Sequence, residues 1–163
     1  MDNLLCQLEE ELMAKGGRWI ADFNESERNY SLDGVTFDVC IRGDTKIREP
    51  GLFSRAMSAF LLPRYLVVCY VVARATVSAH FLRKCLGLAK NRSKADDVTW
   101  TWLIVTVQQT PSKDVLQIVR GLTEKEIGLL VYDRGSGSLA ASGNLLGERM
   151  KSCVRLWSKA SPR

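Results

Sequence analysis

Three apolar runs, separated by two segments with helical spacing, occupy the middle of the chain. The runs are residues 65–72, 98–107 and 127–132, and each is rich in β-branched and aromatic residues and bounded by polar or turn residues, as in β-strands. Between them, apolar residues recur at helical spacing at Val77, Phe81, Cys85 and Leu88, and then at Val115, Ile118, Val119 and Leu122. The order β-α-β-α-β predicts neighbouring strands joined by right-handed crossovers, with the first two parallel.

The flanking segments add a helix at each end and a hairpin before the core. Residues 1–16 predict an N-terminal amphipathic helix, and residues 18–62 predict a hairpin and a connecting helix. In the hairpin, a strand at 18–23 and a polar turn at 24–31 precede a strand at 35–41, whose Val35, Phe37, Val39 and Ile41 alternate onto one face. The connecting helix is expected at 52–62.

The remaining residues complete one domain. Residues 64–142 form the β-α-β-α-β core, and 138–142 is expected to pair with 127–132 as a short last strand. Residues 144–160 predict a basic amphipathic helix capped by Asn144, with Leu146, Met150, Cys153 and Trp157 as its apolar stripe. We therefore predict a single α/β domain over residues 1–163, with three layers and a central mixed sheet flanked by helices.

Composition excludes several classes of protein. No apolar run is long enough to cross a membrane, and the N-terminus lacks a basic signal region, so we expect a cytoplasmic protein without membrane contact. The five cysteines form no C-x-x-C pair and lie in apolar contexts, which indicates small buried hydrophobic residues kept reduced. His80 is the only histidine, which argues against a Cys/His zinc site and a histidine-activated nucleophile.

Charge is unevenly distributed along the chain. Residues 1–50 hold 6 Lys and Arg against 11 Asp and Glu, a net charge of −5, whereas residues 51–163 hold 17 against 7, a net charge of +10. Between Pro50 and Ala95 there is no acidic residue, and eight basic residues stand there: Arg55, Arg64, Arg74, Arg83, Lys84, Lys90, Arg92 and Lys94. A segment of one sign attracts polyanions, of which nucleic acid is the usual one.

The helix that begins near Val77 concentrates this charge. Arg83, Gly87, Lys90 and Lys94 fall on one helical face, and Lys84 and Arg92 lie in the same segment. A glycine between basic residues lets a phosphodiester backbone approach closely; the alternative is a solvated face with an incidental glycine. Trp100 and Trp102 share one strand face, where they would stack on bases or form core.

The element order, with an aspartate in the second strand, resembles the restriction-endonuclease-like (PD-(D/E)xK) nuclease superfamily, which includes archaeal Holliday-junction resolvases and Mrr-type enzymes. The resemblance covers roughly residues 4–142, and the stretch 123–135, Thr-Glu-Lys-Glu-Ile-Gly-Leu-Leu-Val-Tyr-Asp-Arg-Gly, is similar to the last helix, strand and turn of many such domains. It implies carboxylates that hold Mg²⁺ and an assisting lysine.

The resemblance assigns catalytic and metal-binding roles to particular residues. Asp38 matches the strand aspartate as catalytic and metal ligand, and Glu10 matches an optional helical ligand. The strand at 65–74 carries no acid for the acid-x-Lys motif, although Arg74 would stand near the lysine. The alternative motif is Asp44-Thr-Lys46, preceded by Asp33, so Asp44 and Lys46 are further catalytic candidates.

Two functions from different classes remain. The leading hypothesis is a nucleic-acid-binding protein with a nuclease-like fold that binds DNA, either a divergent Mg²⁺-dependent endonuclease or an inactive one. If the chain is active, Asp38→Ala would abolish cleavage and leave the fold intact. The alternative is a non-catalytic interaction module, which binds a protein partner or forms a homodimer within a nucleic-acid-processing complex.

Overall fold

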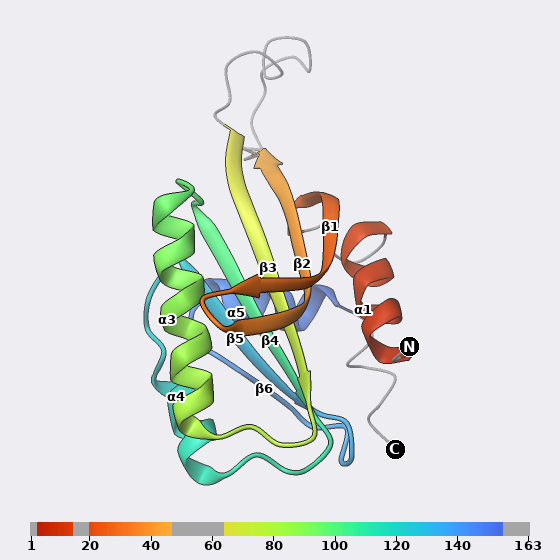
Figure 1. Cartoon of the computed structure of the whole chain (residues 1–163), viewed down its shortest axis with the longest axis vertical. Helices are drawn as coiled ribbons and strands as arrows, with labels where there is room; N and C mark the ends of the chain where they lie inside the picture. The colour runs from red at the N-terminus through yellow and green to blue at the C-terminus, as the bar shows by residue number, and fades with distance from the viewer. Residues whose placement is uncertain (1–2, 15–19, 47–63, 155–163) are drawn as a thin grey trace.

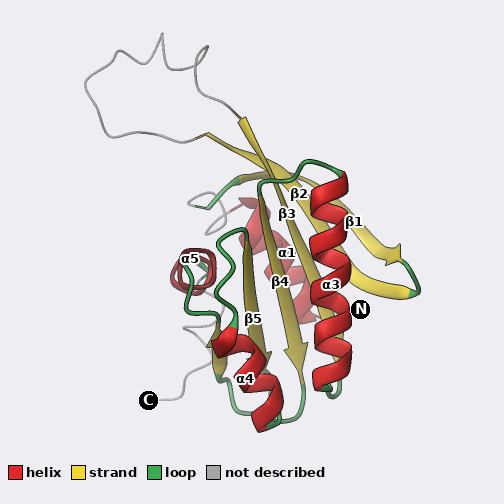
Figure 2. Ribbon diagram, turned by 90° about the vertical axis from the view of Figure 1, so that its left-hand side faces the viewer, coloured by secondary structure: helices red, strands yellow, loops and turns green. Residues whose placement is uncertain are grey.

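A six-stranded mixed sheet with helices on both faces forms the protein (Figures 1 and 2). The computed structural model describes residues 3–14, 20–46 and 64–154. In chain order its elements are α1 (Asn3–Ala14), β1 (Asp22–Leu32), β2 (Val35–Lys46), β3 (Arg64–Arg74), α3 (Ala79–Ala95), β4 (Trp100–Val107), α4 (Lys113–Gly121), β5 (Ile127–Asp133), β6 (Leu139–Ala141) and α5 (Leu145–Cys153). The predicted α/β class is confirmed.

The strands lie in the sheet in the order in which they occur along the chain. β1, β2 and β3 are antiparallel neighbours, β3, β4 and β5 are parallel, and β6 pairs antiparallel with β5. The register aligns Cys69 with Trp102 and Ile104 with Leu130. The prediction that the three apolar runs are adjacent strands, the first two of them parallel, is confirmed, as is the short hairpin between β5 and β6.

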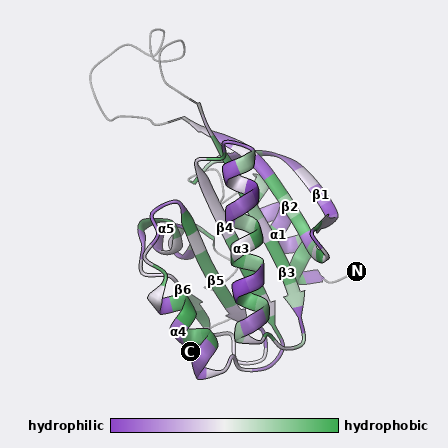
Figure 3. Cartoon of the chain, turned by 60° about the vertical axis from the view of Figure 1, so that its left-hand side comes forward, coloured by the Kyte–Doolittle hydropathy of each residue, from purple (hydrophilic) through white to green (hydrophobic). Residues whose placement is uncertain are grey.

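Each face of the sheet has its own hydrophobic core. On one face, Leu8 and Leu12 of α1 and Leu146 and Met150 of α5 pack against strand residues such as Trp102. On the other, buried residues of α3 and α4 pack against Leu103, Val105 and Val107 of β4 and their neighbours. Because both faces are covered, the central strands are apolar along most of their length, as the green strands of Figure 3 show.

The hairpin before the core differs from its prediction in three ways. The first strand, expected at 18–23, begins only at Asp22. Residues 24–31, expected to form a polar turn, belong to β1, and β2 continues past the expected end at Ile41 to Lys46. β1 is an edge strand whose side chains are mostly exposed, so its sequence carries no apolar alternation. Gly43 lies where the register shifts between Phe23 and Glu25, and a Cβ atom there would collide with the Asp22 backbone.

The alternating stripe of β2 is split between the two cores, which the pattern did not predict. Val35 and Phe37 pack on the α3 side, whereas Val39 and Ile41 pack on the α1 side. The pairing of β2 with β3 begins at Val39 although β3 continues to Arg74, so the residues of β2 before Val39 separate from β3. Opposite this point in β1, Asn29 adopts a left-handed φ of 55°. The hairpin tip therefore reaches over the α3 face.

The remaining predictions about local structure are mostly confirmed. Asn144 caps α5, and its side chain accepts a hydrogen bond from Gly147 N–H at 2.9 Å. All five cysteines are free; Cys40, Cys69 and Cys85 are buried, and Cys6 and Cys153 are partly buried. The connecting helix predicted at 52–62, and Trp157 of the C-terminal stripe, lie outside the described residues. Among the described helices, none combines the length and apolar character that a membrane crossing requires.

Candidate nucleic-acid interface

Helix α3 is fixed at both ends by its own sequence. The Ser78 hydroxyl caps the N-terminus by accepting a hydrogen bond from Phe81 N–H at 3.1 Å. At the other end, Asp96 N–H donates to the Arg92 carbonyl, and Arg92 and Lys94 lie in the last turn, where cations favour the helix dipole. Asp97 follows with a left-handed φ of 53° and ends the helix.

The buried face of α3 is not the predicted one. Its buried residues are Leu82, Cys85, Ala89 and Ser93. Of the predicted apolar face, Cys85 alone is fully buried, whereas Phe81 and Leu88 are partly buried at the edge of the core. The helix is rotated about its axis relative to the prediction, because small Ala89 and Ser93 fit against the sheet; the Ser93 hydroxyl is within hydrogen-bonding distance (2.5 Å) of Thr101 Oγ1.

This rotation divides the predicted basic residues into two groups. Lys90 and Arg92 lie on the flanks of α3, where Lys90 Nζ pairs with Glu124 and Arg92 Nε pairs with Asp96 at 2.6 Å. Both acids follow the acid-free segment in the chain, so the sequence pattern did not show them as partners. Arg83, Lys84 and Lys94 are exposed, and no acidic residue in the described part of the chain pairs with them.

The outward face of α3 is therefore basic and polar throughout. It consists of His80, Arg83, Lys84, Gly87, Asn91 and Lys94, which we call the outer face of α3. A Cβ atom built on Gly87 would meet no other atom within 4 Å, so packing within the protein does not require glycine there. Purple stretches along α3 in Figure 3 mark the hydrophilic residues.

Asp38 lies where β2 separates from β3, and its carboxylate is engaged in structure. Asp38 Oδ2 accepts hydrogen bonds from Ala73 N–H at 2.8 Å and from Arg74 Nη1 at 3.0 Å. The Arg74 guanidinium also donates to the carbonyl oxygens of Thr36 and Ala73 and lies over the Phe81 ring, 5.7 Å from its centroid. Asp38 thus binds a strand N–H that β2 no longer reaches, and Arg74 holds the two strand ends together.

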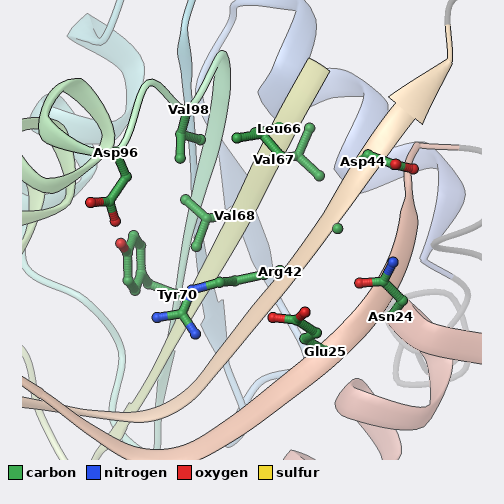
Figure 4. A pocket seen from close by; sticks show the side chains of 11 residues that line it. Asn24, Glu25, Arg42, Asp44, Leu66, Val67, Val68, Tyr70, Asp96 and Val98 are labelled. Carbon is green, nitrogen blue, oxygen red and sulfur yellow. The ribbon is translucent and has the colours of Figure 1, made fainter. Parts of the chain in front are cut away.

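The other candidates for catalysis and metal binding do not converge on Asp38. Asp44 is six residues further along β2, which corresponds to roughly 20 Å, and it lines a pocket on the α3 side (Figure 4). Glu10 is on α1, which covers the opposite face of the sheet. Lys46 ends β2, and its side chain lies outside the described part of the structure.

The described side chains do not fit a Mg²⁺ site of the kind that the resemblance implies. Within residues 3–14, 20–46 and 64–154, no three His, Cys, Asp or Glu side chains are close enough to hold a metal ion together. At Asp38, the neighbouring basic group is a guanidinium that already pairs with the carboxylate.

The two tryptophans have different environments. Trp102 is fully buried, and its Nε1–H donates to the Leu146 carbonyl at 3.0 Å, so it belongs to the core. Trp100 is partly buried and stacks on Tyr65, with ring centroids 6.0 Å apart. Neither tryptophan lies on the outer face of α3.

Sequence reasoning missed the pocket that Asp44 lines, because its central residue, Tyr70, stands within an apolar strand. The signal that was present is a phenol in a fully apolar run, since a buried tyrosine hydroxyl usually has a hydrogen-bond partner.

Searches of protein-family models, curated proteins and solved structures found no match to this chain.

Proposed function

We propose that this chain binds nucleic acid through the outer face of α3 and does not cleave it. The observation that carries the proposal is the group of exposed cations Arg83, Lys84 and Lys94, for which the described residues offer no acidic partner. With a rise of about 1.5 Å per residue, Arg83 and Lys94 lie roughly 16 Å apart along the helix axis. That length would place them beside several successive phosphates of one strand.

The absence of cleavage in this proposal is supported by the surroundings of Asp38. The register of β2 and β3 aligns Val39 with Val71, so Val72, Ala73 and Arg74 lie beside Asp38. Where the resembling nucleases need an acid, this strand has Val72, which is buried in the core. Arg74 provides the positive charge beside the carboxylate that a metal ion would otherwise provide.

The salt dependence of DNA binding tests the proposal. Each phosphate contact releases condensed counterions, so log affinity falls by about 0.9 per contact for each log unit of salt. Replacement of Arg83, Lys84 and Lys94 by alanine is expected to reduce the slope by roughly 3 and to weaken binding to all duplex sequences alike. Affinity is measured by fluorescence anisotropy over a range of salt concentrations.

A charge-matched control separates this effect from net charge. Three basic residues outside α3 serve as the control: Arg28, Arg149 and Lys151. Arg28 pairs with Glu9 of α1, which covers the face of the sheet opposite α3. Their triple alanine variant loses the same charge and is expected to keep most of the salt slope. Equal loss in both variants, or no binding by the wild type at low salt, would contradict the proposal and favour the interaction module.

Gly87 provides a second test that does not alter charge. Because open space surrounds Gly87, Gly87→Ala is expected to stabilise the helix by up to about 1 kcal/mol. If a phosphodiester backbone approaches the helix there, the added methyl group will weaken DNA binding despite the gain in stability. Unchanged affinity would show that the glycine is incidental to binding.

A further inference from the structure

A pocket of about 260 Å³ opens on the α3 side of the sheet, near the start of the parallel strands (Figure 4). Its polar lining includes Asn24, Glu25, Arg42, Tyr70 and Asp96. The pocket adjoins the C-terminal end of α3, and Asp96 follows Lys94 of the outer face by two residues. A ligand in the pocket would therefore lie close to the basic face proposed above.

Irregular backbone on two sides shapes the pocket. On the β1 side, the register shift next to Gly43 places Asn24 and Glu25 at the rim. On the α3 side, the left-handed Asp97 turns the chain back, and Val98 N–H donates to the Ser93 carbonyl at 2.8 Å. Val98 then lines the pocket together with Leu66 and Val68, which provides an apolar wall.

The Tyr70 hydroxyl is an unpaired polar group directed into this pocket. Tyr70 is 2% exposed, and its ring packs against Phe37 with centroids 4.9 Å apart. Figure 4 shows its hydroxyl pointing toward Asp96, yet none of the described residues forms a hydrogen bond with it. Among the described residues, Thr106 Oγ1 and not the Tyr70 hydroxyl is the buried side-chain atom without a partner, so the Tyr70 hydroxyl is reached from the pocket, where a ligand can bond to it.

Two charged groups beside Tyr70 retain hydrogen-bonding capacity. Asp96 Oδ2 accepts from Arg92 Nε, which leaves Oδ1 as an acceptor at the rim. Arg42 Nη1 donates to Glu27 at 3.2 Å, and the guanidinium has further N–H groups beside Tyr70 (Figure 4). The pocket thus combines a carboxylate acceptor, a guanidinium donor and a hydroxyl with an apolar wall.

We infer that this pocket receives a single unstacked nucleobase that bears an exocyclic amino group, an inference that rests on the proposed nucleic-acid binding. A carboxylate accepts a hydrogen bond from the amino group of cytosine, and a guanidinium donates to base carbonyl or ring nitrogen acceptors. Uracil and thymine have a carbonyl where cytosine has the amino group, so they would oppose the Asp96 carboxylate. The apolar wall suits the flat face of a base.

The inference specifies single-stranded or flipped nucleic acid as the substrate form. A base within a duplex is stacked and paired on both sides, so it cannot enter a pocket beneath the helix end without leaving the stack. The phosphates of the same strand would contact Lys94 and its neighbours on α3. The outer face would then provide affinity, and the pocket would provide the preference between bases.

Titration of the ¹⁵N-labelled full chain with nucleosides tests the pocket without any contribution from phosphates. Cytidine is expected to shift the amide signals of Val68, Tyr70 and Val98, and uridine is expected to bind about tenfold more weakly. Tyr70→Phe removes only the hydroxyl and is expected to weaken cytidine binding about threefold to tenfold. Tyr65→Phe, on the strand's other face, is the matched control and is expected to change nothing.

Oligonucleotides separate the failure of this inference from the failure of the proposed function. Oligo-dC is expected to bind more tightly than oligo-dT, and Asp96→Asn is expected to reduce that difference. If cytidine shifts the pocket signals but no oligonucleotide binds, the inference stands and the proposed function is wrong. The inference is overturned if oligonucleotides bind without base preference and cytidine shifts no amide signal. It is also overturned if the pocket signals shift with agmatine, a small guanidinium cation, and not with cytidine.

Discussion

The two ends of the parallel strands differ in how the polar side chains of β3 and β5 are engaged. Where the strands finish, Arg74 bonds to Asp38 and to two carbonyl oxygens. The buried Asp133 carboxylate accepts hydrogen bonds from the Thr110 and Ser136 hydroxyls and from the N–H groups of Gly135 and Ser136. Toward the other end, the Tyr70 hydroxyl faces a pocket lined also by Leu66 and Val98, and it has no hydrogen-bond partner among the described residues.

This difference reverses the usual arrangement of open α/β sheets, in which ligands bind beyond the carboxyl ends of the strands. Here the carboxyl ends of β3 and β5 are linked by hydrogen bonds within the chain itself. α3 and α4 also pack on the same face of the sheet, so successive crossovers do not diverge to create a crevice between them. At the amino ends, the Tyr70 hydroxyl faces the pocket beside the end of α3, whereas at the carboxyl end of β4 the buried Thr106 Oγ1 is without a partner among the described residues.

The largest expected effect is at the closed end, for Asp133→Ala. Four donors lose their acceptor at a position that is 1% exposed, and the free energy of unfolding is expected to fall by about 3 kcal/mol. Urea denaturation measures the change. Glu126→Ala, which removes an exposed carboxylate near the start of β5, is the control and is expected to have little effect. A loss below about 1 kcal/mol for Asp133→Ala would contradict the idea of a closed end.

The same carboxylate predicts a loss of stability in acid. Burial alone would raise the pKa of Asp133, but the hydrogen bonds from Ser136, Thr110 and Gly135 lower it below its usual value. Because the folded pKa is below the unfolded one, the contribution is complete above about pH 4 and is lost as the pH falls through the folded pKa. Denaturation midpoints of wild type and Asp133→Asn, compared from neutral pH downward, are expected to converge in acid.

A smaller loss is expected for Asp38→Ala, which unpairs the Ala73 N–H and one side of Arg74. The expected decrease in the free energy of unfolding is about 1 to 2 kcal/mol, because the pair is partly exposed and water replaces some of the contacts. Thr36→Val is a suitable control, since Arg74 contacts the Thr36 carbonyl and not its side chain. Stabilisation of wild type by added Mg²⁺, lost in Asp38→Ala, would favour the metal-site hypothesis instead.

The smallest effect is expected at the open end and has the opposite sign. Tyr70→Phe removes a hydroxyl that faces the pocket and has no hydrogen-bond partner among the described residues, so the free energy of unfolding is expected to stay unchanged or to rise slightly. Thermal denaturation of the ligand-free protein measures this change. A clear loss of stability would mean that the hydroxyl is already paired, and the contrast between the two ends would disappear.

The sheet and its helices could be predicted because burial on both faces leaves a strong signal in the sequence. Apolar runs identified β3, β4 and β5 as neighbouring strands, and Asn144 identified the start of α5. β1 could not be predicted in the same way, since an exposed edge strand needs no apolar alternation. The face change at Asp38 also left no signal, because it depends on where β2 separates from β3.

The site was harder to predict than the fold, for a physical reason that particular residues illustrate. Asp38 stood out as an acid within a strand, yet a carboxylate at a strand end can serve the backbone as well as a ligand. The pairing of Lys90 with Glu124 joins residues 34 positions apart, which no local pattern reports. Tyr70 did not stand out, because an unpaired hydroxyl becomes evident only when its surroundings are known.

The agreement between strand order and chain order has a consequence for how the protein folds. Every strand pairs with the strand that precedes it, so the sheet extends from β1 to β6 without the insertion of a later strand between earlier ones. During synthesis, each new strand finds its neighbour already present, and the separation between paired residues stays short for a mixed sheet. The growing edge is exposed only until the next strand arrives, and β6, three residues long, leaves little edge for another chain to pair with.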